Sequence, residues 1–380
     1  MEMRIKYSII TPVYNRADCI MRCIKSVENA INKIEGGCPK TQCQMSEILQ
    51  SVSLLDDSGL ANGCNSRLSG QNTSKSSRGA FNLKVESSRN GVLGQAGGEF
   101  EHIIVDDGST DATVSIVEEY VKGHPHVVFV KFDHNRGTNA ARNEAIRIAK
   151  GKWSVILDSD DYFVDNALQV IVNTMQKKPN YKHYMFVPDD MQGYFEKNLI
   201  IRGAAQKVLL YPDFLNGYIG GDFIHVCSTE ILRKYPFDER LRIYEGVFFL
   251  MFFREAQQML FTNNVVTIRE RNRKDSVTKD VLRTSDKVIG KSVLRNETYL
   301  KNFEEDLHVL GMSRRLHLVQ MNLLEDYLLL GKYEEAKELI AKTKKIKGKK
   351  GKVLKLVSSL KLGYLYKVTL KLYLILKYKI

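Results

Sequence analysis

The sequence predicts an α/β fold: a doubly wound, mostly parallel sheet with helices on both faces, followed by a helical C-terminal region. Three observations lead to this prediction. Short apolar runs typical of buried strands alternate with segments whose apolar residues recur at helical spacing. Acidic and hydroxyl residues gather directly after several of these runs. From about residue 297 onward the pattern is helical throughout.

The strands and helices alternate through the first 180 residues, with one interruption. A first strand over 7–11 ends at Pro12, and Asn15 is placed to cap the helix that follows. After the interruption, strands are predicted over 102–105, 127–132 and 153–157, and helices over 109–122, 138–149 and 166–177. Such alternation is typical of parallel strands joined by crossover helices. The pattern is mixed between about 180 and 270.

The interruption, over 35–99, is rich in Ser, Gly, Asn and Gln and poor in large apolar residues. A segment of this composition buries too little surface to offset its ordering entropy, so we expect a low-complexity, mostly disordered insertion with a short helix near 46–55. The insertion joins a helix to a strand, so it should lie opposite the carboxyl ends of the strands, where ligands bind in an open α/β sheet.

The net charge of +13 is concentrated at the C-terminus. After Glu338 there is no acidic residue and there are thirteen lysines, interleaved with Leu, Val and Tyr. A nucleic-acid-binding protein would spread its basic charge over the fold, so no nucleic-acid partner is expected. The pattern favours a tail that lies on an anionic membrane surface, although a solvated tail or a basic helix packed on the body remains an alternative. We therefore predict a catalytic domain over 1–275, a helical extension over 276–340 and a lysine-rich amphipathic tail over 341–380.

The chain shows neither a signal-peptide region before its first strand nor a stretch of about 20 apolar residues that would span a bilayer. The expected location is cytoplasmic, peripheral on the inner face of the plasma membrane. Reduced thiols are accordingly predicted for the six cysteines, whose spacing does not match a standard zinc site. These are Cys19, Cys23, Cys38, Cys43, Cys64 and Cys227.

Three polar clusters follow predicted strands, at 11–15, 106–109 and 158–161. The carboxyl ends of parallel strands meet at one edge of the sheet, so the clusters should converge there. The Asp158-Ser-Asp160-Asp161 cluster offers oxygen ligands suited to Mg²⁺ or Mn²⁺, with substrate phosphates completing the coordination. Two common nucleotide motifs are absent, since the glycines at 91–98 do not lie between a strand and a helix, and Ser285 replaces the first P-loop glycine before Gly290-Lys-Ser.

Four segments together resemble the nucleotide-binding half of family 2 glycosyltransferases, which have the GT-A fold. These segments are residues 7–15, 105–111, 135–143 and 157–161. The resemblance covers 7–34 and 100–275. It implies a nucleoside-diphosphate sugar donor, which we expect to be a UDP-sugar. It also implies a divalent metal (Mn²⁺ or Mg²⁺) and inversion at the anomeric carbon. The implied class is a metal-dependent hexosyltransferase that builds a capsule, O-antigen or exopolysaccharide on a saccharide or lipid-linked saccharide acceptor.

The resemblance also implies roles for individual residues. Thr11, Pro12 and Tyr14 would line the nucleoside pocket, and Asp106 or Asp107 would accept a hydrogen bond from the base. The other donor ligands would be Arg142 and Asp158, together with Arg271 and Ser276 in a loop over the diphosphate. Asp160 would be the main metal ligand, helped by Asp158 and Asp161.

An inverting transfer needs a general base that deprotonates the acceptor hydroxyl. The matching place in the family is an acidic pair before a helix, which corresponds here to Glu245, although Gly246 stands where many members have Asp. Asp222 is the reserve candidate. A helix N-terminal acid favoured by the helix dipole is the structural alternative for Glu245.

Processive members of the family carry Gln-x-x-Arg-Trp and membrane spans, whereas the single tryptophan here, Trp153, lies in a predicted strand. We therefore expect the addition of one sugar at a time. Two alternatives stay open: a non-catalytic nucleotide-sugar-binding protein that keeps the fold, and a nucleotidyltransferase that would release pyrophosphate.

Overall fold

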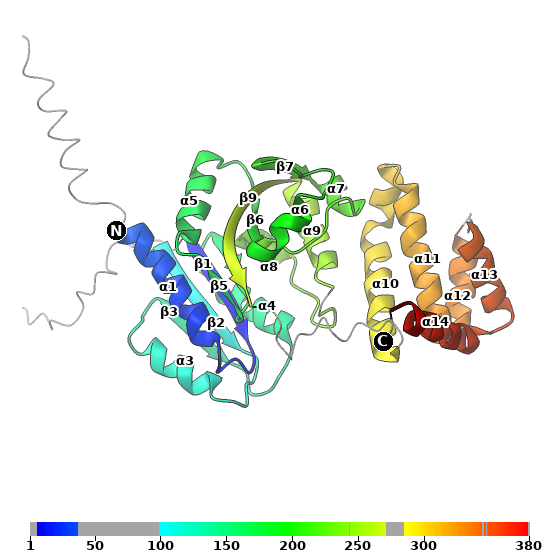
Figure 1. Cartoon of the computed structure of the whole chain (residues 1–380), viewed down its shortest axis with the longest axis horizontal. Helices are drawn as coiled ribbons and strands as arrows, with labels where there is room; N and C mark the ends of the chain where they lie inside the picture. Colours follow the sequence, from blue (N-terminus) through cyan, green and yellow to red (C-terminus); the bar gives the residue numbers. More distant parts are fainter. Residues whose placement is uncertain are drawn as a thin grey trace, which may run out of the picture.

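A computed structural model describes residues 6–36, 99–242, 244–270, 285–343, 346 and 348–378. Within these residues, nine strands form one sheet in the order β3-β2-β1-β4-β8-β6-β9-β5, with β7 paired to β9. Helices cover both faces of the sheet, and a group of C-terminal helices stands beside its second half (Figure 1). The predicted α/β class and helical C-terminal region are both confirmed.

The first half of the sheet is parallel, as the apolar runs predict. Its strands pair in the order β3-β2-β1-β4, and Ile9 and Ile10 of the central strand β1 are fully buried. The strands are β1 (Tyr7–Val13), β2 (Phe100–Asp106), β3 (Val127–Lys131) and β4 (Trp153–Ile156). The helices between and after them are α1 (Ile20–Gly36), α3 (Thr113–Val121), α4 (Thr138–Ile148) and α5 (Ala167–Lys177).

The second half of the sheet is mixed, so the whole sheet is less parallel than the sequence predicts. β8 runs antiparallel to both β4 and β6, β9 runs parallel to β6, and β5 and β7 are antiparallel to β9. The strands are β5 (Asp161–Phe163), β6 (His183–Pro188), β7 (Gln206–Leu210), β8 (Ile224–Ser228) and β9 (Gln258–Arg269). The helical segments of this half are η3 (Asp189–Met191), α6 (Gln192–Phe195), α7 (Tyr211–Leu215), α8 (Thr229–Lys234) and α9 (Gly246–Ala256).

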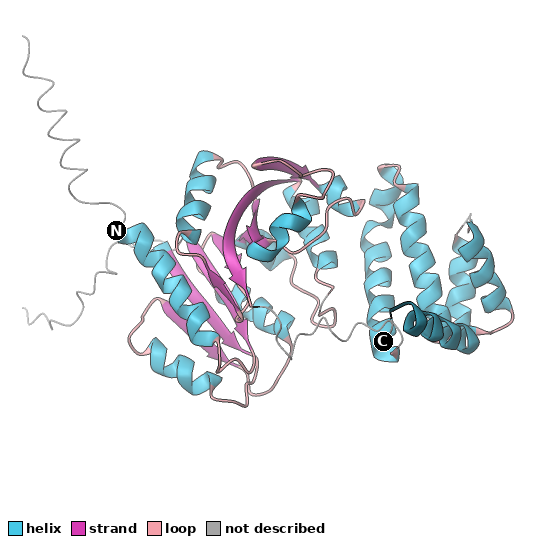
Figure 2. Ribbon diagram, in the orientation of Figure 1, coloured by secondary structure: helices cyan, strands magenta, loops and turns pink. Residues whose placement is uncertain are grey.

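Each face of the sheet has its own core, because successive strand residues point to opposite sides. Ile9 and Val13 pack with α1, α3 and α5, whereas Ile10 packs with α4, α8 and α9 on the other face. Figure 2 shows the helices on either side of the strands. This alternation also decides which residues at the end of β1 can reach a ligand.

The predicted insertion over 35–99, with its short helix near 46–55, falls almost wholly outside the described residues. Its two flanks are described: α1 ends at Gly36, and β2 begins at Phe100, which pairs with Tyr7 at the start of β1. Phe100 therefore lies at the amino-terminal edge of the sheet, opposite the carboxyl ends of β1, β2 and β4.

The C-terminal helices begin at Asp286, within the predicted extension over 276–340 and before the helical pattern that is evident from about residue 297. Ser285 caps the first of them by accepting a hydrogen bond from the Val288 amide, and the helix continues as one element for 24 residues. The helices are α10 (Asp286–Val309), α11 (Ser313–Leu329), α12 (Tyr333–Lys342), α13 (Gly348–Ser359) and α14 (Gly363–Tyr378).

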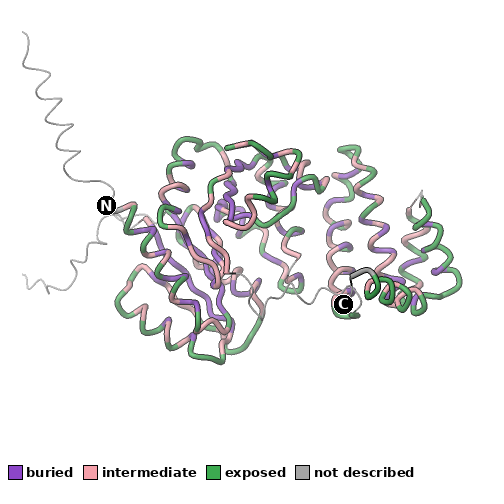
Figure 3. Tube along the Cα trace, viewed as in Figure 1, coloured by how far each residue is buried: buried purple, intermediate pink, exposed green. Residues whose placement is uncertain are grey.

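The lysine-rich tail is helical and partly packed on this group. Leu354 and Val357 of α13 are buried in a core with Leu324 and Leu328 of α11. Along α14, by contrast, Leu372 and Leu376 are exposed. Figure 3 draws much of this helix in green, the colour of exposed residues. Among the described helices, none is long and apolar enough to cross a membrane.

Candidate active site

One large cavity, of about 1450 Å³, opens at the carboxyl ends of β1, β2 and β4. All three polar clusters contribute to its wall, as the parallel topology predicts. The contributors from these clusters include Pro12, Tyr14, Asp107, Asp158, Asp160 and Asp161. Arg142, Asp222 and Glu245 line the same cavity, so the structure brings most of the candidate residues together.

Two candidates for the nucleoside pocket, Thr11 and Asp106, point elsewhere. The Thr11 side chain is fully buried, and its Oγ1 lies 2.9 Å from Nε2 of His102. Asp106 is also buried, and its Oδ2 accepts a hydrogen bond from the Ser109 amide at 2.8 Å. Neither is among the residues that line the cavity. The strand alternation places Thr11 on the face of Ile9 and Val13, under α1.

Asp107 reaches the cavity and also shapes it. Its carboxylate accepts hydrogen bonds from the amides of Arg136, at 2.7 Å, and Gly137, at 2.9 and 3.0 Å, directly before α4. Gly108 has φ +72°, and a Cβ there would lie 2.4 Å from the His134 carbonyl carbon, so only glycine fits. Burial raises the pKa of Asp107, and the two amides lower it in part.

Asn15 ties the first two clusters together instead of capping α1. It has φ +49°, its side chain accepts a hydrogen bond from the Thr110 amide at 2.8 Å, and its own amide donates to Ser109 Oγ at 2.9 Å. The helix begins five residues later, at Ile20. The β1 and β2 loops are therefore fixed to each other beside the cavity.

Arg142 of α4 connects the end of β4 to the start of α9. Its Nη2 donates to Asp158 Oδ1 at 2.8 Å, and its Nη1 donates to Glu245 Oε1 at 3.3 Å. The Arg142 side chain is only 12% exposed. Burial alone would raise the pKa of Asp158, but Arg142, helped by Arg269 and Arg16, holds it below the ordinary value. The guanidinium fixes both carboxylates at one end of the cavity.

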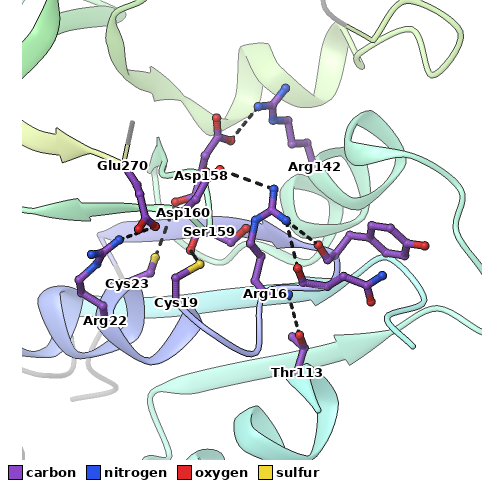
Figure 4. A network of polar contacts seen from close by, with 12 residues as sticks. Arg16, Cys19, Arg22, Cys23, Thr113, Arg142, Asp158, Ser159, Asp160 and Glu270 are labelled. Atoms are coloured by element: carbon purple, nitrogen blue, oxygen red, sulfur yellow. Dashed lines mark hydrogen bonds and ion pairs between the residues drawn. The ribbon is translucent and has the colours of Figure 1, made fainter. Parts of the chain in front are cut away.

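Two cysteines lie beneath the backbone of the acidic loop: Cys19, directly before α1, and Cys23, within its first turn. Cys19 Sγ is 3.9 Å from the Ser159 carbonyl oxygen, and Cys23 Sγ is 3.8 Å from the Asp158 carbonyl oxygen (Figure 4). Both thiols are free and buried, as is Cys227, in accordance with the prediction of reduced cysteines. Cys38, Cys43 and Cys64 lie outside the described residues. Cys19 and Cys23 thus support the loop that carries Asp158 and Asp160.

The other two aspartates of this loop face arginines. Arg16 Nη2 lies 3.5 Å from Asp160 Oδ2, a contact drawn in Figure 4, and Arg269 Nε lies 3.9 Å from Asp161 Oδ2. Burial, followed by the charges of Asp158 and Asp160, raises the pKa of Asp161 to about 8. Burial is thus the main reason that Asp161 resists ionisation, and the neighbouring carboxylates add to it.

These carboxylates fit a divalent cation only as a partial ligand set. Their oxygen atoms suit Mg²⁺ or Mn²⁺, and Asp158, Asp160 and Asp161 line one cavity. Nevertheless, no group of three or more acidic, histidine or cysteine side chains in the described part of the chain is arranged to hold a metal alone. Substrate oxygens would have to complete the coordination.

Glu245 stands at the N-cap position of α9, where its side chain is 23% exposed. No heavy atom lies within 4 Å of the place where a Cβ of Gly246 would stand, so the cavity has room beside it. The reserve candidate, Asp222, is 74% exposed and pairs with Arg269 Nη1 at 3.2 Å. Glu245 is therefore the better enclosed of the two carboxylates.

Five arginines that line the cavity were not predicted from the sequence: Arg16, Arg242, Arg269, Arg295 and Arg315. Arg16 and Arg269 face the aspartates, and Arg295 and Arg315 line the cavity from α10 and α11. Arg16 directly follows the first polar cluster, a signal that could have identified it, whereas helical spacing gave no reason to select Arg295 or Arg315. The predicted donor ligands Arg271 and Ser276 lie outside the described residues.

An α/β sheet with acidic residues at the carboxyl ends of its parallel strands, beside a large cavity, agrees with the predicted GT-A fold. Residues 85–240 match the model of the family described as Glycosyl transferase family 2. This part of the chain is therefore similar to family 2 glycosyltransferases, in agreement with the resemblance that the sequence motifs predict.

Two curated relatives illustrate the similarity. The chain is 31% identical over 160 residues to the UDP-Glc:alpha-D-GlcNAc-diphosphoundecaprenol beta-1,3-glucosyltransferase WfaP of Escherichia coli, covering 41% of this chain and 58% of WfaP. It is 25% identical over 205 residues to the GalNAc(5)-diNAcBac-PP-undecaprenol beta-1,3-glucosyltransferase of Campylobacter jejuni, covering 52% and 64%. The chain thus spans less than two thirds of either relative.

A solved structure supports the fold assignment. The crystal structure of S. aureus TarS 1-349 in complex with UDP-GlcNAc aligns with a TM-score of 0.50 and 14% identity, covering 89% of this chain and 83% of that one. At this identity, the likeness shows a shared fold.

Proposed function

We propose that this protein transfers one sugar at a time, with inversion, from a nucleoside-diphosphate sugar to a saccharide acceptor. UDP is the expected nucleotide, since the name of the E. coli relative specifies UDP-Glc. The observation that carries the proposal is the Arg142 bridge, because it holds a donor-side carboxylate, Asp158, and a candidate base, Glu245, in one cavity.

In the proposed reaction, the acceptor hydroxyl attacks the anomeric carbon from the face opposite the leaving group. The bond between this carbon and the diphosphate oxygen breaks, and the nucleoside diphosphate leaves with the electron pair. Glu245 takes the hydroxyl proton through a carboxylate oxygen. Arg142 contributes by fixing the carboxylate at 3.3 Å, which limits the positions from which it can accept the proton.

Asp107, Pro12 and Tyr14 would bind the nucleoside, since they line the cavity at the ends of β1 and β2. Asp160, with Asp158 and Asp161, would hold a divalent cation together with the donor diphosphate. When bound, such a cation offsets negative charge on the leaving group.

The acceptor is proposed to be lipid-linked, in the synthesis of a bacterial surface polysaccharide. Both curated relatives are named for undecaprenol-linked diphosphate substrates. The exposed leucines of α14 and the lysines of the tail would hold the protein on the cytoplasmic face of the membrane, where anionic lipid attracts basic segments.

The test is UDP binding by calorimetry, with and without Mn²⁺, on the wild type and Asp160→Ala. Asp165→Ala is the matched control, since Asp165 pairs with Lys33 and its side chain is 79% exposed. We expect metal-dependent binding in the wild type and the control, and its loss in Asp160→Ala.

Absence of UDP, GDP and TDP binding to the wild type in the presence of metal would refute the donor site. Nucleotide binding without turnover on any donor and acceptor would instead favour a non-catalytic binding protein. Release of pyrophosphate, in place of nucleoside diphosphate, would indicate a nucleotidyltransferase.

A further inference from the structure

The C-terminal helices form part of the cavity wall. This contribution is unexpected from the sequence, which places the helical extension after the catalytic domain. The residues that line the cavity from α10 and α11 are Arg295, Asn296, Tyr299, Arg315, Val319 and Asn322. Two of them are arginines, so the extension brings positive charge to the cavity.

Arg295 lies beside the candidate base. Its Cζ is 5.0 Å from the centroid of the Tyr244 ring, within the range of a cation–π contact, and Tyr244 directly precedes Glu245. Its Nη2 also donates to Asn296 Oδ1 at 3.1 Å. The guanidinium is therefore held next to the position where the acceptor hydroxyl would be deprotonated.

Arg315 of α11 is held against Tyr299, which lies one helical turn after Arg295 on α10. Its Nε donates to the Tyr299 hydroxyl at 3.3 Å, and that hydroxyl donates to the Leu215 carbonyl at 2.8 Å. The opposite wall is Gly217, where a Cβ would lie 2.8 Å from Arg315 Nη1. Gly217 has φ +75°, so both the backbone conformation and the space favour glycine.

The partners of Arg315 differ from those of the other site arginines. Arg16, Arg142 and Arg269 each face a carboxylate within 4 Å. Within the described ranges, no carboxylate forms an ion pair with Arg315; its contacts are with Tyr299. A guanidinium at a cavity wall without a carboxylate partner is suited to an anionic ligand, and its planar donor set fits phosphate.

The helix that carries Arg295 and Tyr299 is firmly attached to the sheet domain. Phe303 is fully buried in the core of that domain, and Asp306 accepts hydrogen bonds from Tyr211 and, at 2.7 Å, from Arg254. Arg295 and Arg315 consequently keep a defined position relative to Glu245.

We propose that Arg315, assisted by Arg295, binds a phosphate group of the acceptor, so that the substrate accepted by this end of the cavity is a phosphate-bearing saccharide. The inference rests on the proposed function, in which the donor phosphates lie at the Asp158–Asp161 loop. The contacts lead from that loop through Arg142 to Glu245. The adjacent Tyr244 contacts Arg295 of α10, and Tyr299, four residues later on the same helix, contacts Arg315.

The experiment measures binding of a second anion to the full chain after the donor site is saturated with UDP and Mn²⁺. The probes are citronellyl diphosphate, which represents a lipid diphosphate, and a glycerol-phosphate oligomer, which represents a polyol-phosphate chain. The variants are Arg315→Gln, Arg295→Gln and Arg315→Lys. Arg314→Gln is the matched control, as Arg314 is the exposed neighbour on the same helix.

At least one probe should bind to the UDP-loaded wild type and to Arg314→Gln with similar affinity. Arg315→Gln should weaken binding roughly 10- to 100-fold, the range expected for losing charge-assisted hydrogen bonds to phosphate. Arg315→Lys should restore part of the affinity. UDP binding should stay unchanged in all variants, which also shows that they are folded. The probe that binds identifies the source of the phosphate.

Three results would overturn the proposal: neither probe binds the UDP-loaded wild type, Arg314→Gln loses as much affinity as Arg315→Gln, or Arg315→Gln weakens UDP binding itself. The last would assign Arg315 to the donor. If the wild type binds a probe but not UDP, the phosphate site stands and the proposed donor chemistry fails, so the two failures are distinguishable.

Discussion

Arg142 donates a hydrogen bond to Asp158 at 2.8 Å while its other terminal nitrogen reaches Glu245 at 3.3 Å. Asp158 follows β4, and Glu245 precedes α9, 87 residues later in the chain. One side chain therefore sets the distance between two carboxylates that the sequence alone cannot relate.

Arg142→Gln is expected to lower both stability and activity. The substitution leaves two carboxylates without their common cation, and the cost should be roughly 2–3 kcal/mol, below that of a fully buried pair because Asp158 is half-exposed. Urea unfolding measures this loss. Arg147→Gln is the control on the same helix, since Arg147 is exposed and pairs with Glu144. Equal stability of the two variants would contradict the bridging role.

Glu245→Gln is expected to reduce kcat by about 10²- to 10⁴-fold, the usual contribution of a general base. UDP affinity should be retained, because the base acts on the acceptor. Asp222→Asn should change kcat by less than about tenfold, since Asp222 is exposed and paired with Arg269. Steady-state kinetics with a screened acceptor gives both values, and the reverse order of effects would make Asp222 the base.

Acid should destabilise the fold through buried histidines, of which His102 is the simplest to test. Burial, and secondarily His126, lowers the pKa of His102 to about 3. An unfolded histidine titrates near pH 6.5, so between pH 6.5 and 3 the unfolded state binds the extra proton. The contribution of neutral His102 to stability is thus complete above pH 6.5 and falls by about 1.4 kcal/mol for each pH unit below it.

The measurement compares the free energy of unfolding at pH 7 and pH 5 for the wild type, His102→Gln and His308→Gln. His102→Gln should show a weaker pH dependence, while His308→Gln, in an exposed position on α10, should follow the wild type. Identical pH dependence in all three proteins would rule out His102 as a source of acid sensitivity.

Phe303→Ala is expected to destabilise the whole chain by about 3–5 kcal/mol, as large-to-small changes in a core do. Phe303 is on α10 but belongs to the core of the sheet domain, so unfolding should remain a single transition over the sheet and α10. Val309→Ala, at a position that is 79% exposed on the same helix, should have little effect. A variant that loses only its C-terminal helices on mild heating would show that α10 docks weakly.

Membrane attachment through α14 predicts binding to vesicles that contain phosphatidylglycerol and weak binding to pure phosphatidylcholine. Replacing Leu372 and Leu376 by Asp should weaken binding at least about tenfold, because two apolar side chains can no longer enter the interface. Leu318→Asp, on an exposed position of α11, is the control. Vesicle flotation at low and high salt reports the result, and equal binding to both lipids would exclude the tail as an anionic-lipid anchor.

The parallel half of the fold was predictable because its signals are local. The apolar runs of β1, β2 and β4 and the helical spacing of α1 and α4 appear within short windows, and each predicted boundary lies within a few residues of the observed one. The antiparallel half depends on pairings such as β4 with β8, which join residues more than 70 positions apart. No local sequence pattern predicts such a pairing.

The site was predictable to the same extent. Converging loops placed Asp107 and Asp160 in one cavity, as parallel topology requires. Thr11 is buried against His102 and lies outside the lining of the cavity. Arg295 and Arg315 could not be predicted, because their position at the cavity depends on how α10 and α11 pack against the sheet, which helical periodicity does not encode.

α10 places Phe303 in the core of the sheet. A hybrid that took its sheet from one relative and its α10 from another would therefore disturb the packing of that core. α11 extends the constraint, since Val319 faces the core of the sheet while Leu324 faces the core of the C-terminal helices. A hybrid chain joined at the turn around Gly331 would keep both helices with the sheet on which they pack. Whether relatives are recombined in the laboratory or in evolution, α10 and α11 should therefore stay with the sheet that carries the aspartates of the cavity.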